Sequence, residues 1–219
     1  IRDSRKHICF IVDAAQGAGL LPLSLKDGIN IICTAGHKGL YGPMGTGLML
    51  TDGKYPLKTF MEGGTGSASE SLEQPDFLPD RFESGTINTP GAIALGAGVE
   101  FVKARTPQKI LAHETALCRS LCGMLRKIPG ITVYSDIDRQ PEKFAPVVSF
   151  NIGSIPSAEA STRLSDLGFC LRGALHCAPL AHKKLGTLET GTVRFAPSAF
   201  TVPEEVSRLA KAVKSLSGA

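Results

Sequence analysis

The sequence has no apolar run of roughly 18 residues, the length that a membrane-spanning helix requires, and no recognisable secretion signal. Charge of one sign is also scarce, because 24 Lys and Arg stand against 20 Asp and Glu, and no basic stripe is interleaved with aromatics. We therefore expect neither a membrane nor a nucleic acid as partner. The composition, 42% hydrophobic and 20% charged, indicates a globular chain with one large or two small domains.

Paired cysteine motifs are absent as well. None of the six cysteines forms a C-x-x-C pair, and several lie within apolar runs. This pattern is typical of reduced thiols in the cytoplasm and disfavours a disulfide framework or a zinc site, so we expect no metal. Cys118 and Cys122 are spaced for one face of a predicted helix, which indicates packing.

Residues 11–47 carry the most informative pattern. Two short apolar runs, residues 8–12 and 29–33, are bounded by Gly, Pro and Asp and predict buried parallel strands. Asp13 follows the first run and Lys38 follows the second, so both side chains are expected at carboxyl ends of strands, where open α/β sheets bind ligands. An acid and a lysine in one crevice suit pyridoxal phosphate, since the lysine forms the Schiff base and the acid keeps the pyridine nitrogen protonated.

The remaining pattern predicts an α/β chain. A strand at 47–50, antiparallel to its neighbour, is followed by a long loop at 65–79 and by helices at 90–105 and 108–127. Pro129-Gly130 marks the expected domain boundary. Beyond it we expect strands at 131–134, 147–152, 169–172 and 192–196, and helices at 157–167 and 203–216. Ser157 is the expected N-cap of the first of these helices.

Several motifs occur in an order that resembles a known family, across residues 10–206. The chain resembles the class V aminotransferase-like branch of fold-type I pyridoxal phosphate enzymes, and within it the cysteine desulfurase and selenocysteine lyase group. The motifs are DAAQ (13–16), AGHKGLYGPMGTG (35–47), RFESGTINTPGAI (81–93), LRGALHCAP (171–179) and TVRFAP (192–197).

The resemblance implies a domain organisation. Residues 1–128 are expected to be the C-terminal portion of the large pyridoxal phosphate-binding domain, and 129–219 the small α+β C-terminal domain. Enzymes of this family are about twice as long, and their phosphate-binding Gly/Thr loop and cofactor-stacking aromatic residue precede the DAAQ-type motif. Because the chain begins at Ile1 without them, we expect it to be the C-terminal half of a larger enzyme.

The resemblance also implies roles at the cofactor. Lys38 is expected to form the Schiff base, Asp13 to pair with the pyridinium nitrogen, Gln16 to donate to the phenolic oxygen and His37 to contact the phosphate. From the residues alone, simpler alternatives exist for three of these residues. Lys38 can be a surface lysine, Asp13 a cap of the following segment, and His37 a structural histidine.

Two threonines are further candidates for phosphate contacts. The family has Ser or Thr three residues before the lysine, where this chain has Ala35, so Thr34 is the expected substitute. Thr86 matches a threonine that reaches the phosphate of the neighbouring subunit, which implies a homodimer with shared sites. The simpler alternative for this segment is a turn with an ion pair between Arg81 and Glu83.

A second set of motifs concerns the substrate. The segment from Arg172 to Cys177 resembles the family's Arg-x-Gly-x-x-Cys pattern, whose cysteine accepts sulfur as a thiolate. Leu175 stands where the nearest branch has a second histidine, beside His176, a substrate-binding candidate. Arg194 is expected to bind the substrate carboxylate with help from Arg172, because a planar guanidinium suits bidentate contacts. The alternatives are a packed thiol and surface ion pairs.

These roles imply conversion of L-cysteine or L-selenocysteine to L-alanine, with sulfur transferred to Cys177 as a persulfide and passed to an acceptor protein. Two alternatives remain open. Another class V reaction, such as transamination, epimerisation or a β-lyase step, needs Lys38 and Asp13 but not Cys177. The chain alone can also be a non-catalytic fragment or dimerisation half.

Overall fold

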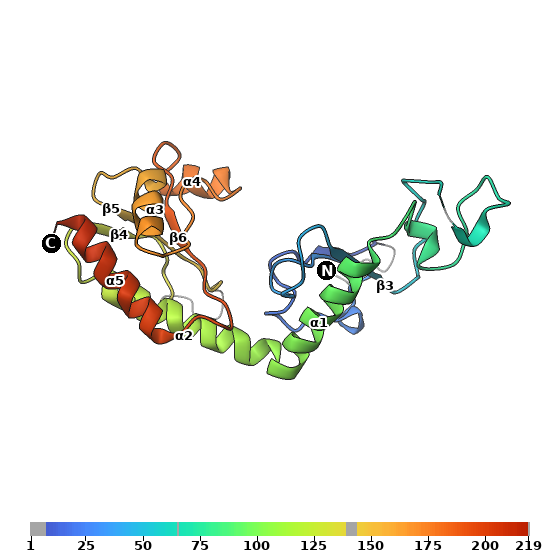
Figure 1. The fold of residues 1–219 in the computed structure, drawn as a ribbon, viewed down its shortest axis with the longest axis horizontal. Coiled ribbons are helices and arrows are strands. Elements are labelled where there is room, and N and C mark those ends of the chain that lie inside the picture. The colour runs from blue at the N-terminus through green and yellow to red at the C-terminus, as the bar shows by residue number, and fades with distance from the viewer. Residues whose placement is uncertain (1–7, 65, 139–143, 219) are drawn as a thin grey trace. The chain divides into compact units, whose positions relative to one another are not determined.

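The computed structural model describes residues 8–64, 66–138 and 144–218, and its fold is α/β, as predicted. The chain divides into two compact units, Ile1–Gln108 and Lys109–Ala219 (Figure 1). Each unit contains its own three-stranded sheet.

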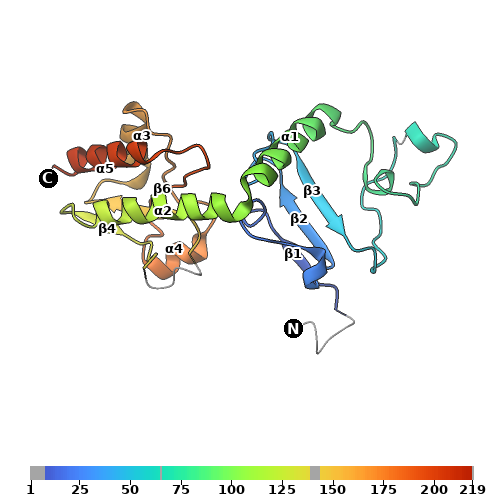
Figure 2. The same ribbon diagram turned by 90° about the horizontal axis from the view of Figure 1, so that it is seen from below.

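The sheet of the first unit has the order β1-β2-β3 (Figure 2). Strands β1 (Ile11–Asp13) and β2 (Ile31–Ala35) pair in parallel, and β3 (Gly47–Thr51) pairs antiparallel to β2. The parallel pair and the antiparallel return are both confirmed, although β1 and β2 extend further toward their carboxyl ends than expected. The predicted burial holds for the second run but is wrong for the first, where Ile8, Phe10 and Ile11 are exposed. Three short 3-10 helices lie in the connections: Leu25–Asp27, Gly66–Ala68 and Asp80–Phe82.

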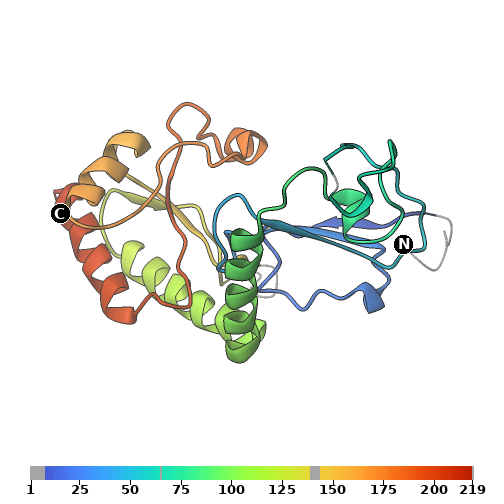
Figure 3. The ribbon, with the colours of Figure 1, turned by 45° about the vertical axis from the view of Figure 1, so that its right-hand side comes forward.

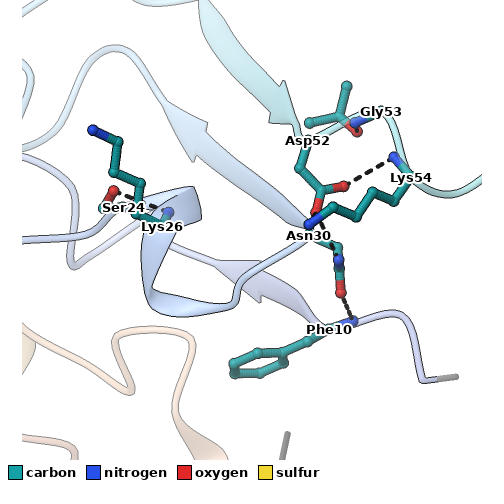
Figure 4. Close-up of polar contacts among 8 residues, drawn as sticks. Phe10, Ser24, Lys26, Asn30, Asp52, Gly53 and Lys54 are labelled. Carbon is teal, nitrogen blue, oxygen red and sulfur yellow. Dashed lines mark hydrogen bonds and ion pairs between the residues drawn. The ribbon is translucent and has the colours of Figure 1, made fainter. Parts of the chain in front are cut away.

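A polar clamp fixes one end of this sheet (Figure 4). The side-chain oxygen of Asn30 accepts from the Phe10 N–H at 2.9 Å, and its amide nitrogen donates to Asp52 at 2.8 Å. The backbone N–H of Lys54 donates to Asp52 at 3.1 Å, and this bond is the main reason that the pKa of Asp52 is lowered. Since Phe10 and Asn30 precede β1 and β2, the clamp lies at the opposite end from Asp13 and aligns the carboxyl ends of both strands.

Helix α1 (Thr89–Arg105) packs on the turn that follows β2. Asn88 caps it by accepting from the Gly91 N–H at 3.0 Å. An added Cβ at Gly98 would overlap the main chain of Leu40 and Tyr41, so the glycine permits close approach of helix and turn.

The second unit is an α+β arrangement in which three antiparallel strands pair in the order β4-β5-β6. Figure 3 shows α2 and α5 lying side by side. Its elements are α2 (Pro107–Leu125), which begins at the junction of the units, β4 (Ile131–Val133), β5 (Val148–Ile152), α3 (Ser157–Asp166), α4 (Pro179–Leu185), β6 (Val193–Phe195) and α5 (Pro203–Ser217).

One hydrophobic core joins most elements of this unit. Leu121 of α2, Phe150 of β5, Leu164 of α3 and Leu209 of α5 are all buried in it. Cys118 lies in the same core with Cys122, which confirms the packing role, and burial raises the pKa of Cys118 to about 12. The described helices include none that is long and apolar enough to cross a membrane.

Two secondary-structure elements differ from the prediction. Residues 169–172 form no strand, because the Leu171 N–H turns back to the Phe169 carbonyl at 2.9 Å and only Arg172 pairs, with Arg194. Helix α4 was not predicted, because its seven residues are too few for a visible helical period. The two units divide within α2; the assignment of 1–128 and 129–219 to domains of a longer enzyme stays a prediction.

Candidate functional site

Two of the predicted cofactor residues lie at the same edge of the first sheet. Asp13 is the last residue of β1 and is paired with Cys33 of β2, while Lys38 lies in the turn directly after β2. Gln16 and His37 lie in the same two turns. The side chains of Asp13, Gln16, His37 and Lys38 are all exposed. The first unit therefore presents an acid, an amine, an amide and an imidazole at adjacent carboxyl ends of parallel strands.

The two turns are in direct backbone contact. A Cβ at Gly19, where φ is 85°, would overlap the Gly39 carbonyl, and a Cβ at Gly39 would overlap the Ala18 carbonyl. Only glycine allows this approach, since every other residue carries a Cβ. The segment after Asp13 is thereby held against the neighbour of Lys38.

The polar side chains of this edge also make local contacts. One carboxylate oxygen of Asp13 accepts from the Ala15 N–H at 2.9 Å, so Asp13 does cap the following turn. The hydroxyl of Thr34 donates to the Ala14 carbonyl at 3.3 Å and lies 3.4 Å from the Ala35 carbonyl. Both distances are at the long end of the hydrogen-bond range.

Thr86 lies outside this edge in the described structure. It is exposed in the segment before α1, and no described contact joins it to the turn of Lys38. The alternative prediction for that segment, an ion pair between Arg81 and Glu83, was wrong. Arg81 instead donates to the Leu57 carbonyl at 2.8 Å and lies 3.9 Å from the Asp76 carboxylate.

In the second unit, Arg172 and Arg194 are direct cross-strand neighbours. They form an antiparallel bridge in which the Arg194 N–H donates to the Arg172 carbonyl at 2.8 Å. Directly opposite residues of such a pair place their side chains on one face, where like charges repel. Neither arginine forms an ion pair with a carboxylate among the described residues. Two adjacent guanidinium groups without an acid suit an anionic ligand.

Cys177 is exposed at the end of the segment that starts at Arg172. The backbone of this segment is unusual, because Ala174, His176 and Cys177 have φ values of 97°, 53° and 61°. Ala174 falls on the glycine of the Arg-x-Gly-x-x-Cys pattern, so this chain holds an alanine in a conformation that favours glycine. The surrounding contacts must impose that conformation.

His176 is one of these contacts. Its Nε2 lies 2.8 Å from the Thr192 carbonyl, which assigns the proton to Nε2, and its Nδ1 is buried without a partner in the described parts of the chain. Burial lowers the pKa of His176, and its electrostatic interactions with Arg194, His182 and Arg172 lower it further, against the opposing effect of the Thr192 carbonyl. These effects favour the neutral imidazole.

Ser157 is a residue whose role the sequence did not indicate. It was expected as the N-cap of its helix, but Pro156 occupies the cap position and Ser157 is the first helical residue. Its hydroxyl instead bonds Thr190 and the Ala174 N–H. The only sequence signals for this contact are Gly173 and Gly191, whose missing Cβ atoms make room for Ser157.

The candidate residues form one group in each unit. The described residues contain no cluster of three or more His, Cys, Asp or Glu side chains suited to a metal. The first group is Asp13, Gln16, Thr34, His37 and Lys38, with Thr86 apart; the second is Arg172, His176, Cys177 and Arg194.

Comparison with known proteins gives consistent matches. Residues 2–209 match the family described as Aminotransferase class-V. A protein of Methanothermobacter thermautotrophicus named "Probable cysteine desulfurase" is 32% identical over 95% of this chain and 53% of that protein. The apo structure of a cysteine desulfurase from Thermococcus onnurineus has a TM-score of 0.82 and 29% identity, over 98% of this chain and 54% of the other.

A cysteine desulfurase structure from Escherichia coli, CsdA, has a TM-score of 0.79 and 25% identity over 94% of this chain and 50% of that chain. The chain thus spans about half the length of the relatives it matches. With nearly its whole length covered by one family, the chain belongs to the class V aminotransferase family.

Proposed function

We propose that this chain is the C-terminal half of a pyridoxal phosphate-dependent cysteine desulfurase that acts on L-cysteine or L-selenocysteine. Residues 1–128 then complete the large cofactor-binding domain and 129–219 form the small domain. The desulfurase names of similar proteins, and their roughly doubled length, support this proposal.

The residues of the first unit fit the cofactor. An amine and a carboxylate at touching turns provide a group for its aldehyde, Lys38, and a partner for its ring nitrogen, Asp13. Gln16, His37 and Thr34 add polar groups for the ring oxygen and the phosphate. When bound, the cofactor supplies an electron sink for bond cleavage next to the substrate amine.

The chain's own residues then carry the remaining steps. Arg194 and Arg172 hold the α-carboxylate, and the Lys38 amine takes up the α-proton. The Cys177 thiolate attacks the substrate sulfur, and the carbon–sulfur bond breaks with its electrons left on the β-carbon. That carbon takes a proton and the Lys38 amine returns the α-proton to the α-carbon, which gives alanine, while the sulfur remains on Cys177 as a persulfide.

The observation that carries the proposal is the arrangement Arg172, Arg194 and Cys177. Two cross-strand guanidinium groups suit an amino-acid carboxylate, and an exposed thiol ends the segment that one of them starts. Other class V reactions use the lysine and the acid but have no need of this cysteine. The thiol therefore favours sulfur transfer over transamination or epimerisation.

We also propose the assembly expected for the family: a cytoplasmic homodimer in which Thr86 contacts the cofactor phosphate of the partner subunit, and a protein that accepts the persulfide sulfur. The exposure of Thr86 supports this, because an exposed hydroxyl is available across an interface.

Turnover with L-cysteine and pyridoxal phosphate tests the sulfur chemistry. We expect alanine as product and a persulfide on Cys177 by mass spectrometry. Cys177→Ala should lose both, while Cys170→Ala, which removes another exposed thiol of the same unit, should keep them. Retained desulfuration in Cys177→Ala, or formation of a keto acid, would contradict the proposal.

Absorbance spectroscopy tests cofactor binding through Lys38. We expect a visible band that borohydride removes and that Lys38→Ala lacks. Lys26→Ala, which changes another exposed lysine of the same unit, should keep the band. A chain that shows no band with added cofactor would favour the non-catalytic alternative.

A further inference from the structure

The segment of residues 172–177, called here the cysteine segment, holds three non-glycine residues at positive φ: Ala174, His176 and Cys177. Such conformations are energetically unfavourable for residues with a Cβ and persist only when the surroundings impose them. The contacts of the segment therefore decide where the Cys177 thiol lies.

Strand β6 and Thr192, the residue before it, hold one side of the segment. The Arg194 N–H donates to the Arg172 carbonyl at 2.8 Å, and the Thr192 N–H donates to the Ala174 carbonyl at 3.2 Å. The His176 Nε2 reaches the Thr192 carbonyl at 2.8 Å. These bonds hold the carbonyls of Arg172 and Ala174, but they leave the Ala174 N–H without a partner on β6.

Ser157 of α3 supplies that partner. Its hydroxyl accepts from the Ala174 N–H at 3.2 Å and donates to the Thr190 carbonyl at 2.6 Å. The residue is only 2% exposed, so water cannot substitute readily for either bond. A hydroxyl is needed here because it donates and accepts through one atom.

Two glycines pack closely against Ser157. A Cβ at Gly173 would overlap the Ser157 carbonyl, and a Cβ at Gly191 would overlap the Ser157 hydroxyl and Ala174. The cysteine segment and the turn before β6 thus both press against one buried side chain. Loss of the hydroxyl removes two bonds at the point where the strained backbone begins.

We infer that Ser157 is a positioning residue for Cys177. Its buried hydroxyl joins the cysteine segment to the turn before Arg194, so that thiol and guanidinium keep a fixed separation within the second unit. The catalytic meaning of this role rests on the proposed desulfurase function; the mechanical role does not.

Hydrogen exchange measured on the full chain tests the inference. In the wild-type protein, the Ala174 amide should exchange as slowly as the amides of β6. Ser157→Ala should raise the exchange rate of the amides at 174–177 about tenfold, the change expected for a lost bond of about 1.4 kcal/mol. Thr162→Ala should leave these rates unchanged, because the exposed Thr162 hydroxyl bonds only the Ala158 carbonyl of its own helix.

Alkylation provides a second readout, with Cys170 as the internal reference. In Ser157→Ala, the rate of iodoacetamide reaction at Cys177 should change severalfold relative to Cys170, whereas Thr162→Ala should keep the wild-type ratio. In an active enzyme, Ser157→Ala should lower kcat with the KM for cysteine changed less than about twofold, since the arginines remain.

Unchanged exchange at 174–177 in Ser157→Ala, with only a lower overall Tm, would overturn the inference and leave Ser157 as a packing residue. If Ser157→Ala does not fold, the wild-type measurement decides, because fast exchange at Ala174 would contradict the role. Exchange and alkylation need neither cofactor nor turnover. If Ser157→Ala changes exchange and alkylation as expected but the wild-type chain lacks desulfurase activity, only the proposed function is refuted and the inference about Ser157 stands.

Discussion

The two units differ most in how completely they bury their apolar side chains. In the second unit, one core includes Phe150, Leu121, Leu164 and Leu209, all at most 1% exposed. Among the described residues of the first unit, the cluster of buried residues contains Ala14, Ile29 and Ile32, and Ile31, Leu40, Leu95 and Val102 are buried outside it. Burial at this scale is the main source of folding free energy, so the second unit is the more stable of the two.

Strand β3 illustrates the lower burial of apolar side chains in the first unit. Leu48, Met49 and Leu50 are 40–45% exposed, although successive side chains of a strand point to opposite faces. Next to it, an apolar groove of about 680 Å³ is lined by residues that include Leu21, Leu40 and Val99. Exposed apolar surface of this kind marks interaction sites. The unit with the proposed cofactor residues thus exposes more apolar surface than the unit with the thiol.

The largest expected effect contrasts the two cores. Phe150→Ala should cost about 3–5 kcal/mol of the unfolding free energy of the second unit, while Ile32→Ala should cost about 2 kcal/mol in the first, because a smaller side chain is removed from a smaller core. Hydrogen exchange against denaturant resolves the units separately. Equal losses of unfolding free energy in the two variants, or destabilisation of both units by Phe150→Ala, would contradict the proposed difference between the two cores.

The next effect concerns the arginine pair. Arg194→Ala should raise the KM for cysteine roughly thirtyfold, because charge-assisted bonds to a carboxylate contribute about 2 kcal/mol. Arg163→Ala removes an arginine of the same unit whose partner is Glu159 in a surface ion pair, and it should change KM less than about twofold. An unchanged KM in Arg194→Ala would exclude carboxylate binding by this side chain.

A smaller effect tests the contact between the two turns. Gly39→Ala places a Cβ against the Ala18 carbonyl and should cost about 1–3 kcal/mol through overpacking. We expect weaker cofactor absorbance as the turns after Asp13 and β2 separate. Gly66→Ala is the matched control, because a Cβ there meets nothing within 4 Å. Full absorbance in Gly39→Ala would show that the turn contact is unimportant.

The smallest effect is a pH dependence. Because the pKa of His176 is lowered in the folded protein, the unfolded chain takes up a proton first as the pH falls below about 6.5. Stability of the second unit should therefore decline below that pH, and His176→Gln should make the decline shallower. Urea unfolding followed by circular dichroism between pH 8 and pH 5 measures both slopes, and identical slopes would contradict the assignment.

Sequence reasoning succeeded where local pattern decides the structure. Apolar runs and glycine-rich turns placed Asp13 and Lys38 at neighbouring strand ends, and helical periodicity placed α1, α2 and α5 within two residues of their bounds. Its failures lie where distant contacts decide. Ser157 has the sequence context of an N-cap, but its hydroxyl bonds residues 17 and 33 positions away, which no local pattern can indicate.

The region around Cys177 shows the same limit. Motif resemblance selected the thiol and both arginines as candidates, but it did not indicate the antiparallel bridge between Arg172 and Arg194, because one of them lies outside any regular strand. The left-handed backbone at Ala174 was also hidden, since alanine gives no signal for positive φ.

The most direct test of the account identifies the amine that holds the cofactor. The chain is incubated with pyridoxal phosphate, reduced with borohydride, digested and mapped by mass spectrometry. The account predicts one modified lysine, Lys38, with much less label when Asp13 is replaced by Ala. Label on a different lysine, or label spread equally over the exposed lysines, would contradict a cofactor site at the ends of β1 and β2.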